Sequence, residues 1–198
     1  MGTRHLTMVI KDNKTKVAQY GQWDGYLESA GVNILNFLKK YNLNYFKEKL
    51  DNVSFYSNEE ERKNWKEFAI SKGIDPEERF VEYTIMDEYN NIYPALNRDI
   101  GTDILEMIIN NNKPLKLRDE SAFAKDSLFC EYAYVIDFDK NVFEVYKGFN
   151  KEPLNNDERF YYLQDINEEY KPVKLVVSFS LNKLPTKEEF IEFDKEDE

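Results

Sequence analysis

The 198-residue sequence contains one cysteine and one histidine, and these two shortages exclude several kinds of site. Cys130 alone can form no intramolecular disulfide, and the chain lacks the cysteines of a structural zinc site. His5 alone excludes a multi-histidine metal centre. We therefore expect no disulfide and no metal site built on Cys or His. A Mg²⁺ or Ca²⁺ site of carboxylates alone stays open, but close carboxylate pairs are expected by chance among 38 acids, so we expect no metal. A reducing compartment follows from the cysteine usage, so we expect a cytoplasmic protein.

Glycine-rich phosphate loops and long apolar runs are also lacking. The seven glycines are scattered, so neither G-x-G-x-x-G nor the P-loop pattern occurs. No stretch approaches the roughly 20 apolar residues of a membrane-spanning helix. The first residues do not show the charged-then-apolar pattern of a signal peptide. The sequence therefore predicts no cofactor and no membrane association.

Basic residues are too few to favour nucleic acid as a partner. Lys and Arg number 27 against 38 Asp and Glu, which gives a net charge of −11. Phosphate neutralisation needs clustered basic residues, so direct nucleic-acid binding is not expected, and a protein with a basic surface fits better. Aromatic residues are abundant at 15% and can form a binding surface. The tyrosines could also line a homodimer interface, so a homo-oligomer stays open.

Strand patterns occur at both ends of the chain and helix patterns between them. Strands are expected over residues 4–10, 16–20, 129–138, 142–147 and 174–179. Helices are expected over residues 31–40, 45–50, 57–73 and 75–89, from residue 99, and over 186–193. Ser57 with Glu60 predicts a capping box, Asp75-Pro76 predicts a helix start, and Thr186 predicts a helix cap. This order is not the alternation of parallel βαβ units. We predict one α+β domain over residues 1–198, with a mainly antiparallel sheet formed by N-terminal and C-terminal hairpins and a helical middle section.

Two segments lie outside this regular pattern. Residues 153–171 are polar and irregular, which is typical of a long surface loop. Residues 186–198 form an acidic end that we expect to be solvated and partly frayed. The alternative is that Phe190 and Phe193 of this end insert into a basic groove of another protein.

Few residues could carry chemistry on their own. His5 lies in the first expected strand, where a structural role is favoured over catalysis. Cys130 lies in an apolar strand, as a small buried hydrophobe does. The D-x-D sequence at Asp137 lacks the glycine and closing glutamate of a calcium loop and fits a hairpin turn better. An N-terminal nucleophile at Thr3 would require an additional cleavage.

The stretch GQWDGY, residues 21–26, follows the first hairpin directly. Gly21 and Gly25 allow unusual backbone angles, and Asp24 can satisfy turn amides. Trp23 needs a further explanation. It either covers the end of the first hairpin or forms a pocket wall in which Asp24 orients a ligand.

Several segments resemble a family of uncharacterised bacterial and phage proteins with an N-terminal MGTR and a Q-aromatic-DGYP segment. They are MGTRHLT, KVAQYGQWDGY, the pair Arg98-Asp99, AKDSLFCEYAYVIDFD and EVYKGFNKEPL. The resemblance spans residues 2–187, and the positions that match the most recognisable segments of the family are Gly2, Thr3, Arg4, Gln22, Asp24, Gly25, Tyr26, Arg98 and Asp99. The chain departs from the pattern at Leu27, in place of proline, and at Ser29, in place of glycine.

Two functional hypotheses follow. The first is a non-enzymatic acidic binding protein, encoded by a phage or mobile element, that binds a basic host protein, for example to inhibit an anti-phage defence system. Its expected binding residues are Arg4, Gln22, Trp23, Asp24, Tyr26, Arg98 and Asp99. The alternative is a small hydrolase or small-molecule-binding protein with a site built from the N-terminal segment and the QWDGY loop. In that case His5 or Asp24 acts as the base and an arginine holds an anion.

Overall fold

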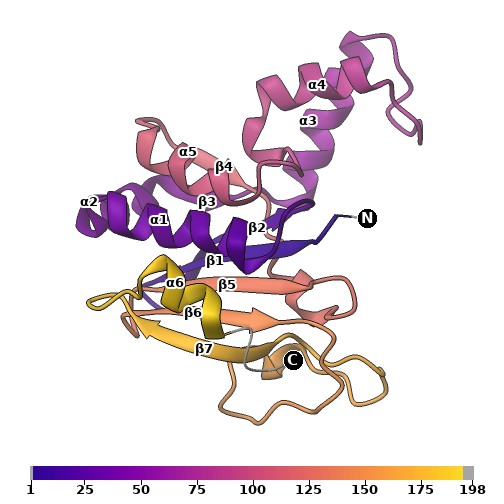
Figure 1. The fold of residues 1–198 in the computed structure, drawn as a ribbon. Coiled ribbons are helices and arrows are strands. Elements are labelled where there is room, and N and C mark those ends of the chain that lie inside the picture. Colours follow the sequence, from indigo (N-terminus) through magenta and orange to yellow (C-terminus); the bar gives the residue numbers. More distant parts are fainter. Residues whose placement is uncertain (1, 194–198) are drawn as a thin grey trace.

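Two hairpins from opposite ends of the chain share one sheet (Figure 1). The first contains β1 (His5–Lys11) and β2 (Lys14–Gly21), and the second contains β5 (Tyr132–Asp137) and β6 (Val142–Lys147), after which β7 (Lys174–Ser180) adds an edge strand. The strand order is β2-β1-β5-β6-β7. β1 and β5 are parallel, whereas the other neighbours are antiparallel. The prediction of an α+β fold with a mainly antiparallel sheet is confirmed.

The computed structural model describes residues 2–193. Four helices cover one face of the sheet in Figure 1: α1 (Val32–Lys40), α2 (Leu43–Lys49), α5 (Ile104–Asn110) and α6 (Lys187–Glu192). Side chains alternate along each strand, so every second residue joins the core beneath these helices. The remaining inward residues form a second core on the opposite face. There they pack against the chain segments around Ala124, Leu154, Phe160 and Val173.

Helices α3 (Asn58–Ser71) and α4 (Tyr83–Ile92) project away from the sheet as a helical arm, defined here as residues 58–92 (Figure 1). The arm has a small aromatic core of its own. At its base, β3 (Val53–Phe55) and β4 (Leu115–Leu117) form a two-stranded parallel sheet. Ion pairs from Lys116 and Arg118 to the first turn of α3 fix the direction of the arm.

The first turn of α3 confirms the expected capping box. The hydroxyl of Ser57 accepts a hydrogen bond from the Glu60 amide at 3.2 Å, and the Glu60 carboxylate accepts one from the Ser57 amide at 2.9 Å. Gly73 follows the helix with a positive φ of 71°, as expected for a helix end.

The helix predicted over residues 75–89 is wrong in its first half, because α4 begins only at Tyr83. Asp75 instead closes a turn, with its carboxylate accepting the Glu77 amide at 3.0 Å and its carbonyl accepting the Glu78 amide at 3.0 Å. The indole N–H of Trp65 donates to the carbonyl of Pro76 at 2.9 Å. Asp75 and Pro76 therefore form a turn instead of a helix start, and the Trp65 side chain of α3 stabilises this turn.

The C-terminal prediction is also corrected. Thr186 caps α6 as expected, but Phe190 is fully buried and lies 5.7 Å from the rings of both Phe143 and Phe179. It is part of this chain's own core and is not free to enter another protein. The acidic residues 194–198 lie outside the described residues.

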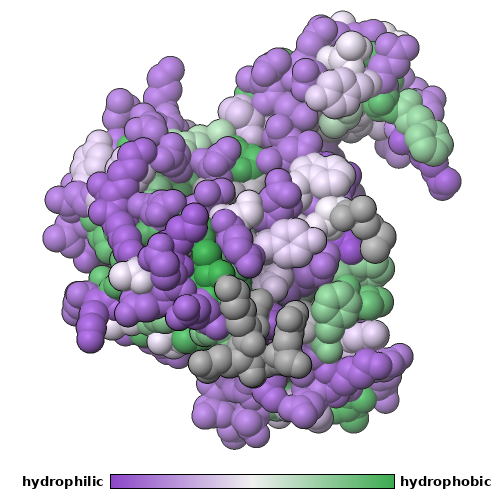
Figure 2. Space-filling view, in the orientation of Figure 1, coloured by the Kyte–Doolittle hydropathy of each residue, from purple (hydrophilic) through white to green (hydrophobic). Residues whose placement is uncertain are grey.

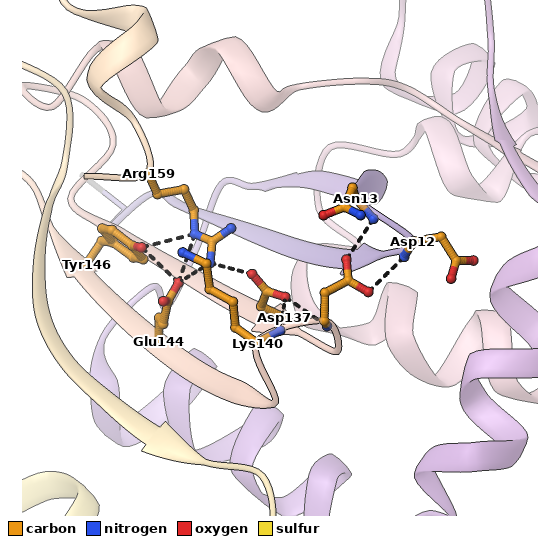
Figure 3. Close-up of polar contacts among 8 residues, drawn as sticks. Asp12, Asn13, Asp137, Lys140, Glu144, Tyr146 and Arg159 are labelled. Carbon is orange, nitrogen blue, oxygen red and sulfur yellow. Dashed lines mark hydrogen bonds and ion pairs between the residues drawn. The ribbon is translucent and has the colours of Figure 1, made fainter. Parts of the chain in front are cut away.

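A buried ionic cluster fastens the irregular segment 149–173 to the sheet (Figure 3). The Arg159 guanidinium lies 2.6 Å from the Asp137 carboxylate and 2.7 Å from the Glu144 carboxylate. The Tyr146 hydroxyl donates to Glu144 at 2.8 Å. Burial opposes ionisation of Asp137, but the Lys140 amide and Arg159 hold the pKa of this carboxyl below its ordinary value.

The turn of the β5–β6 hairpin also contacts the turn of the β1–β2 hairpin (Figure 3). Asp12 and Asn13 have φ values of 56° and 55°, the left-handed geometry of a tight β-turn. Their amides donate to the carboxylate of Asp139 at 2.9 and 2.7 Å. This contact joins the two hairpin turns at the end of β1 and β5 and supports their parallel pairing.

We predict that Arg159→Met lowers the free energy of unfolding by about 3–5 kcal/mol, because it leaves two buried carboxylates without their cation. Urea unfolding at neutral pH measures this change. The matched control is Lys63→Ala, which removes an exposed pair to Glu67 and should change stability by less than about 0.5 kcal/mol. A loss for Arg159→Met as small as that of the control would contradict this role for the cluster.

Candidate functional site

The three segments singled out in the sequence meet at the start of β1. We call this region the N-terminal corner, consisting of residues 2–5, 21–26 and 97–101. The amide of Gly25 donates to the carbonyl of Thr3 at 2.8 Å. Arg98 donates to the side-chain oxygen of Gln22. Sheet pairing brings the first two segments together, because the first residue of β1 lies opposite the last residue of β2, and side-chain hydrogen bonds of Trp23 and Gln22 hold the third.

Trp23 joins two of these segments. Its indole N–H donates to the Asp99 carboxylate at 3.0 Å, and a Cβ added at Gly2 would lie only 2.2 Å from its ring. The side chain still keeps 54% of its surface exposed. Trp23 therefore packs over the N-terminal segment while one side of the ring faces solvent.

His5 lies beneath the corner with only 2% of its surface exposed. Three glycines enclose it: a Cβ added at Gly21 would lie 2.1 Å from the His5 ring, while added Cβ atoms at Gly25 and Gly101 would approach His5 to 3.0 and 3.3 Å. Neither ring nitrogen has a hydrogen-bond partner within the described residues. Burial lowers the pKa of His5 to about 4, so the imidazole is neutral near pH 7.

Two further buried polar side chains lie beyond His5 along the β1–β2 pair. Thr7 and Gln19 face each other across β1 and β2, and both are buried. The Thr7 hydroxyl and the Gln19 side-chain oxygen also lack hydrogen-bond partners in the part of the chain that the structure describes. The buried face of the β1–β2 pair is thus polar near the corner and apolar further along, at Val9 and Val17.

Asp24 and His5, the two candidate bases, have different environments. Asp24 is exposed, with a φ of 53°, and its main-chain oxygen accepts the Ala30 amide at 3.1 Å. The next residue, Gly25, is anchored by its carbonyl, which accepts a hydrogen bond from the Tyr134 hydroxyl at 2.7 Å. The geometry therefore presents the Asp24 carboxylate to solvent and encloses the His5 imidazole.

The rim of the corner carries exposed aromatic side chains. The Arg4 guanidinium lies 4.5 Å from the centre of the Phe129 ring, and a nitrogen of Arg4 lies 3.9 Å from the Glu131 carboxylate. Tyr26 and Phe149 are both more than half exposed. Cys130, next to Phe129, is buried, and burial raises the pKa of its thiol far above the ordinary value.

A second candidate site, which the sequence analysis missed, is a groove on the helical arm. It has a volume of about 450 Å³ and is lined by Glu61, Trp65, Glu78, Arg79, Phe80, Val81, Met86, Tyr89 and Arg118. We call it the arm groove. Figure 2 shows the arm standing off the main body, with a hollow beneath it and hydrophobic side chains at its tip. The available sequence signal was the stretch RFVEY, residues 79–83, in which three large apolar or aromatic residues stand within a polar, irregular connection.

Aromatic packing shapes the wall of the arm groove. Trp65 and Tyr89 form an edge-to-face pair with ring centres 5.3 Å apart. The connection between α3 and α4 then carries Phe80 outward, with 90% of its surface exposed, and Tyr83 follows with 78% exposed. Such exposure of two neighbouring aromatic side chains is unusual for a surface that stays in water.

Ionic contacts form the polar end of the arm groove. Arg118 donates through Nε to the Glu61 carboxylate at 3.0 Å and contacts it again through Nη2. Glu120 lies 3.5 Å from the same guanidinium. Burial, together with the Glu61 charge, raises the pKa of Tyr89 to about 12, so its hydroxyl is protonated at neutral pH.

Comparisons with protein-family models, with curated protein sequences and with solved structures find no match to this chain. Among residues 2–193, no helix is long and apolar enough to cross a membrane. Within the same range, no group of three or more His, Cys, Asp or Glu side chains is arranged to hold a metal ion. The two sites are therefore interpreted from their own geometry.

We predict that His5 makes the protein less stable in mild acid. The pKa of His5 is about 4 in the folded protein against 6.5 in the unfolded chain, so the unfolded state binds more protons between these values. Stability should fall by up to about 3 kcal/mol as the pH drops through this window. In His5→Phe, which keeps a ring in the same space, this part of the pH dependence should vanish. Urea unfolding across the window tests this, and identical profiles for the two proteins would contradict it.

We also predict that Gly21→Ala is destabilising by about 1–3 kcal/mol, because its Cβ would overlap the His5 ring. Combining it with His5→Ala removes the overlap, so the double variant should lose less stability than the sum of the single losses. Gly73→Ala is the control, since a Cβ there meets open space and suffers only from its positive φ. Additive losses at positions 5 and 21 would contradict the proposed contact.

Proposed function

We propose that this protein is a non-enzymatic binding protein and that its helical arm recognises a partner protein with a basic surface. The observation that carries the proposal is the exposure of Phe80 and Tyr83 on a projecting element. Ile70 and Ile92, also on the arm, have 59% of their surface exposed. Exposed apolar side chains grouped on a projecting element, with polar residues around them, are typical of a protein interaction site.

The charge of the arm favours a basic partner. Residues 58–92 contain ten Asp and Glu against five Lys and Arg, a net charge of −5. Such a field steers a positively charged protein toward the arm and raises the association rate, most strongly at low salt. The resemblance to bacterial and phage proteins favours a host protein as the partner, for example a component of an anti-phage defence system.

The alternative, an enzyme or small-molecule site at the N-terminal corner, has weaker support. The segments do converge there, but Trp23 is hydrogen-bonded to Asp99, and Gln22 to Arg98. These groups satisfy one another and hold the corner together. His5, the candidate base, is enclosed beneath them. This arrangement is more typical of a structural junction than of an open reaction site.

We predict that the double variant Phe80→Ser/Tyr83→Ser loses its partner while keeping its fold. Tagged proteins are used to capture partners from bacterial host lysate at low salt, with quantitative mass spectrometry as the readout. Removing two central aromatic contacts should reduce recovery of the partner by about tenfold or more. Added salt should reduce recovery with the unmodified protein as well.

The matched control is Tyr162→Ser/Ile166→Ser, which removes two side chains of comparable exposure, 68% and 83%, from the distant segment 149–173. It should retain the partner. Thermal unfolding of all proteins verifies that the fold is intact. Loss of the partner from the control but not from the arm variant would overturn the proposal.

A further inference from the structure

We propose that the arm groove binds a cationic side chain, an arginine or lysine, of the basic partner. This inference rests on the proposed function and identifies the chemical group that the arm recognises. The groove combines the rings of Trp65, Phe80 and Tyr89 with the carboxylate of Glu78, whereas the Glu61 carboxylate is already paired with Arg118. Aromatic faces attract cations through the ring quadrupole, and nearby carboxylates strengthen that attraction.

The arm and its base already use this type of contact with lysines of the chain itself. The ammonium group of Lys72 lies 5.7 Å from the centre of the Phe68 ring, and that of Lys116 lies 5.6 Å from the centre of the Tyr56 ring. Within residues 2–193, no such contact occupies the rings of Trp65, Phe80 or Tyr89. Phe80, with 90% of its surface exposed, therefore offers its ring to a cation from outside, while the Trp65 and Tyr89 rings pack against each other in the groove wall.

The charges around the groove favour a cation over an anion. Two arginines line it, but Arg118 is paired with Glu61 and Glu120. Arg79 is exposed, and Glu78 lies beside it in the sequence and on the groove wall. The surrounding arm adds its net charge of −5. A cationic side chain can place its head group against the rings and its aliphatic stem along Val81 and Met86.

An NMR titration with N-butylguanidinium tests the inference directly, with neutral N-butylurea of nearly the same shape as the matched probe. The chain has two tryptophans, so two indole N–H signals are expected, and the variant Trp23→Phe assigns them. Butylguanidinium should shift the Trp65 signal in a saturable way, with a dissociation constant on the order of millimolar. The Trp23 signal should stay in place.

Two conservative variants separate cation binding from ordinary apolar contact. Phe80→Leu keeps an apolar side chain but removes a ring face, and Glu78→Gln removes a charge while keeping the shape. Each should weaken butylguanidinium binding by about threefold or more. The control Tyr162→Leu removes an exposed ring from the distant segment 149–173 and should leave the affinity unchanged.

The inference is overturned if butylurea binds as tightly as butylguanidinium, or if neither probe moves the Trp65 signal. Its failure is distinguishable from failure of the proposed function. If the groove does not bind the cation but the Phe80→Ser/Tyr83→Ser variant still loses its partner, only this inference falls. If the groove binds the cation but the arm variant keeps its partner, the proposed function falls and the groove remains a cation site.

Discussion

The parallel pairing of β1 with β5 is the constraint that joins the two hairpins into one sheet. It places the N-terminal strand in the middle of the sheet, with β2 on one side and the C-terminal strands on the other. One end of the sheet therefore contains the starts of β1 and β5 together with the ends of β2 and β6. The contact between Asp139 and the amides of Asp12 and Asn13 stabilises this pairing at the opposite end of the strands.

The positions of the two sites in the fold explain why the N-terminal corner is closed and the helical arm is open. The corner lies where several strand ends meet, so its outer polar side chains have partners nearby, such as Asp99 for Trp23. The arm leaves the sheet after β3 and returns before β4, so only its base contacts the main body. Phe80 and Tyr83 lie on the connection between α3 and α4 and at the start of α4, where most of their surface stays exposed. A closed junction and an exposed projecting element suit a protein that recognises another protein.

Local sequence signals predicted much of the fold but not its long-range connections. The capping boxes at Ser57 and Thr186 and the hairpin alternation depend on neighbouring residues, and they are found as expected. The turn at Asp75-Pro76 was mistaken for a helix start, because its deciding contact comes from Trp65 on another element. The parallel pairing of β1 with β5 also depends on distant contacts that no local pattern contains.

For the candidate sites, too, the sequence identified individual residues but not their long-range contacts. The sequence singled out Trp23, Asp24, Arg98 and Asp99, but it could not show that the corner's hydrogen bonds are made within the corner itself. Enclosure of His5 depends on Gly21 and Gly101 approaching from other segments. The sequence did not predict the arm groove, because its lining comes from α3, from the turn that follows it, from α4 and from Arg118. Such a surface exists only once the chain has folded.

Hydrogen–deuterium exchange of the protein with and without its captured partner tests the central claim most directly. The account predicts that binding slows exchange in residues 72–92, which include the exposed side chains and the groove wall, because docking removes these amides from water. Exchange in residues 2–5, 21–26 and 97–101 should remain unchanged. Protection confined to these N-terminal corner residues, with the arm exchanging as before, would contradict it.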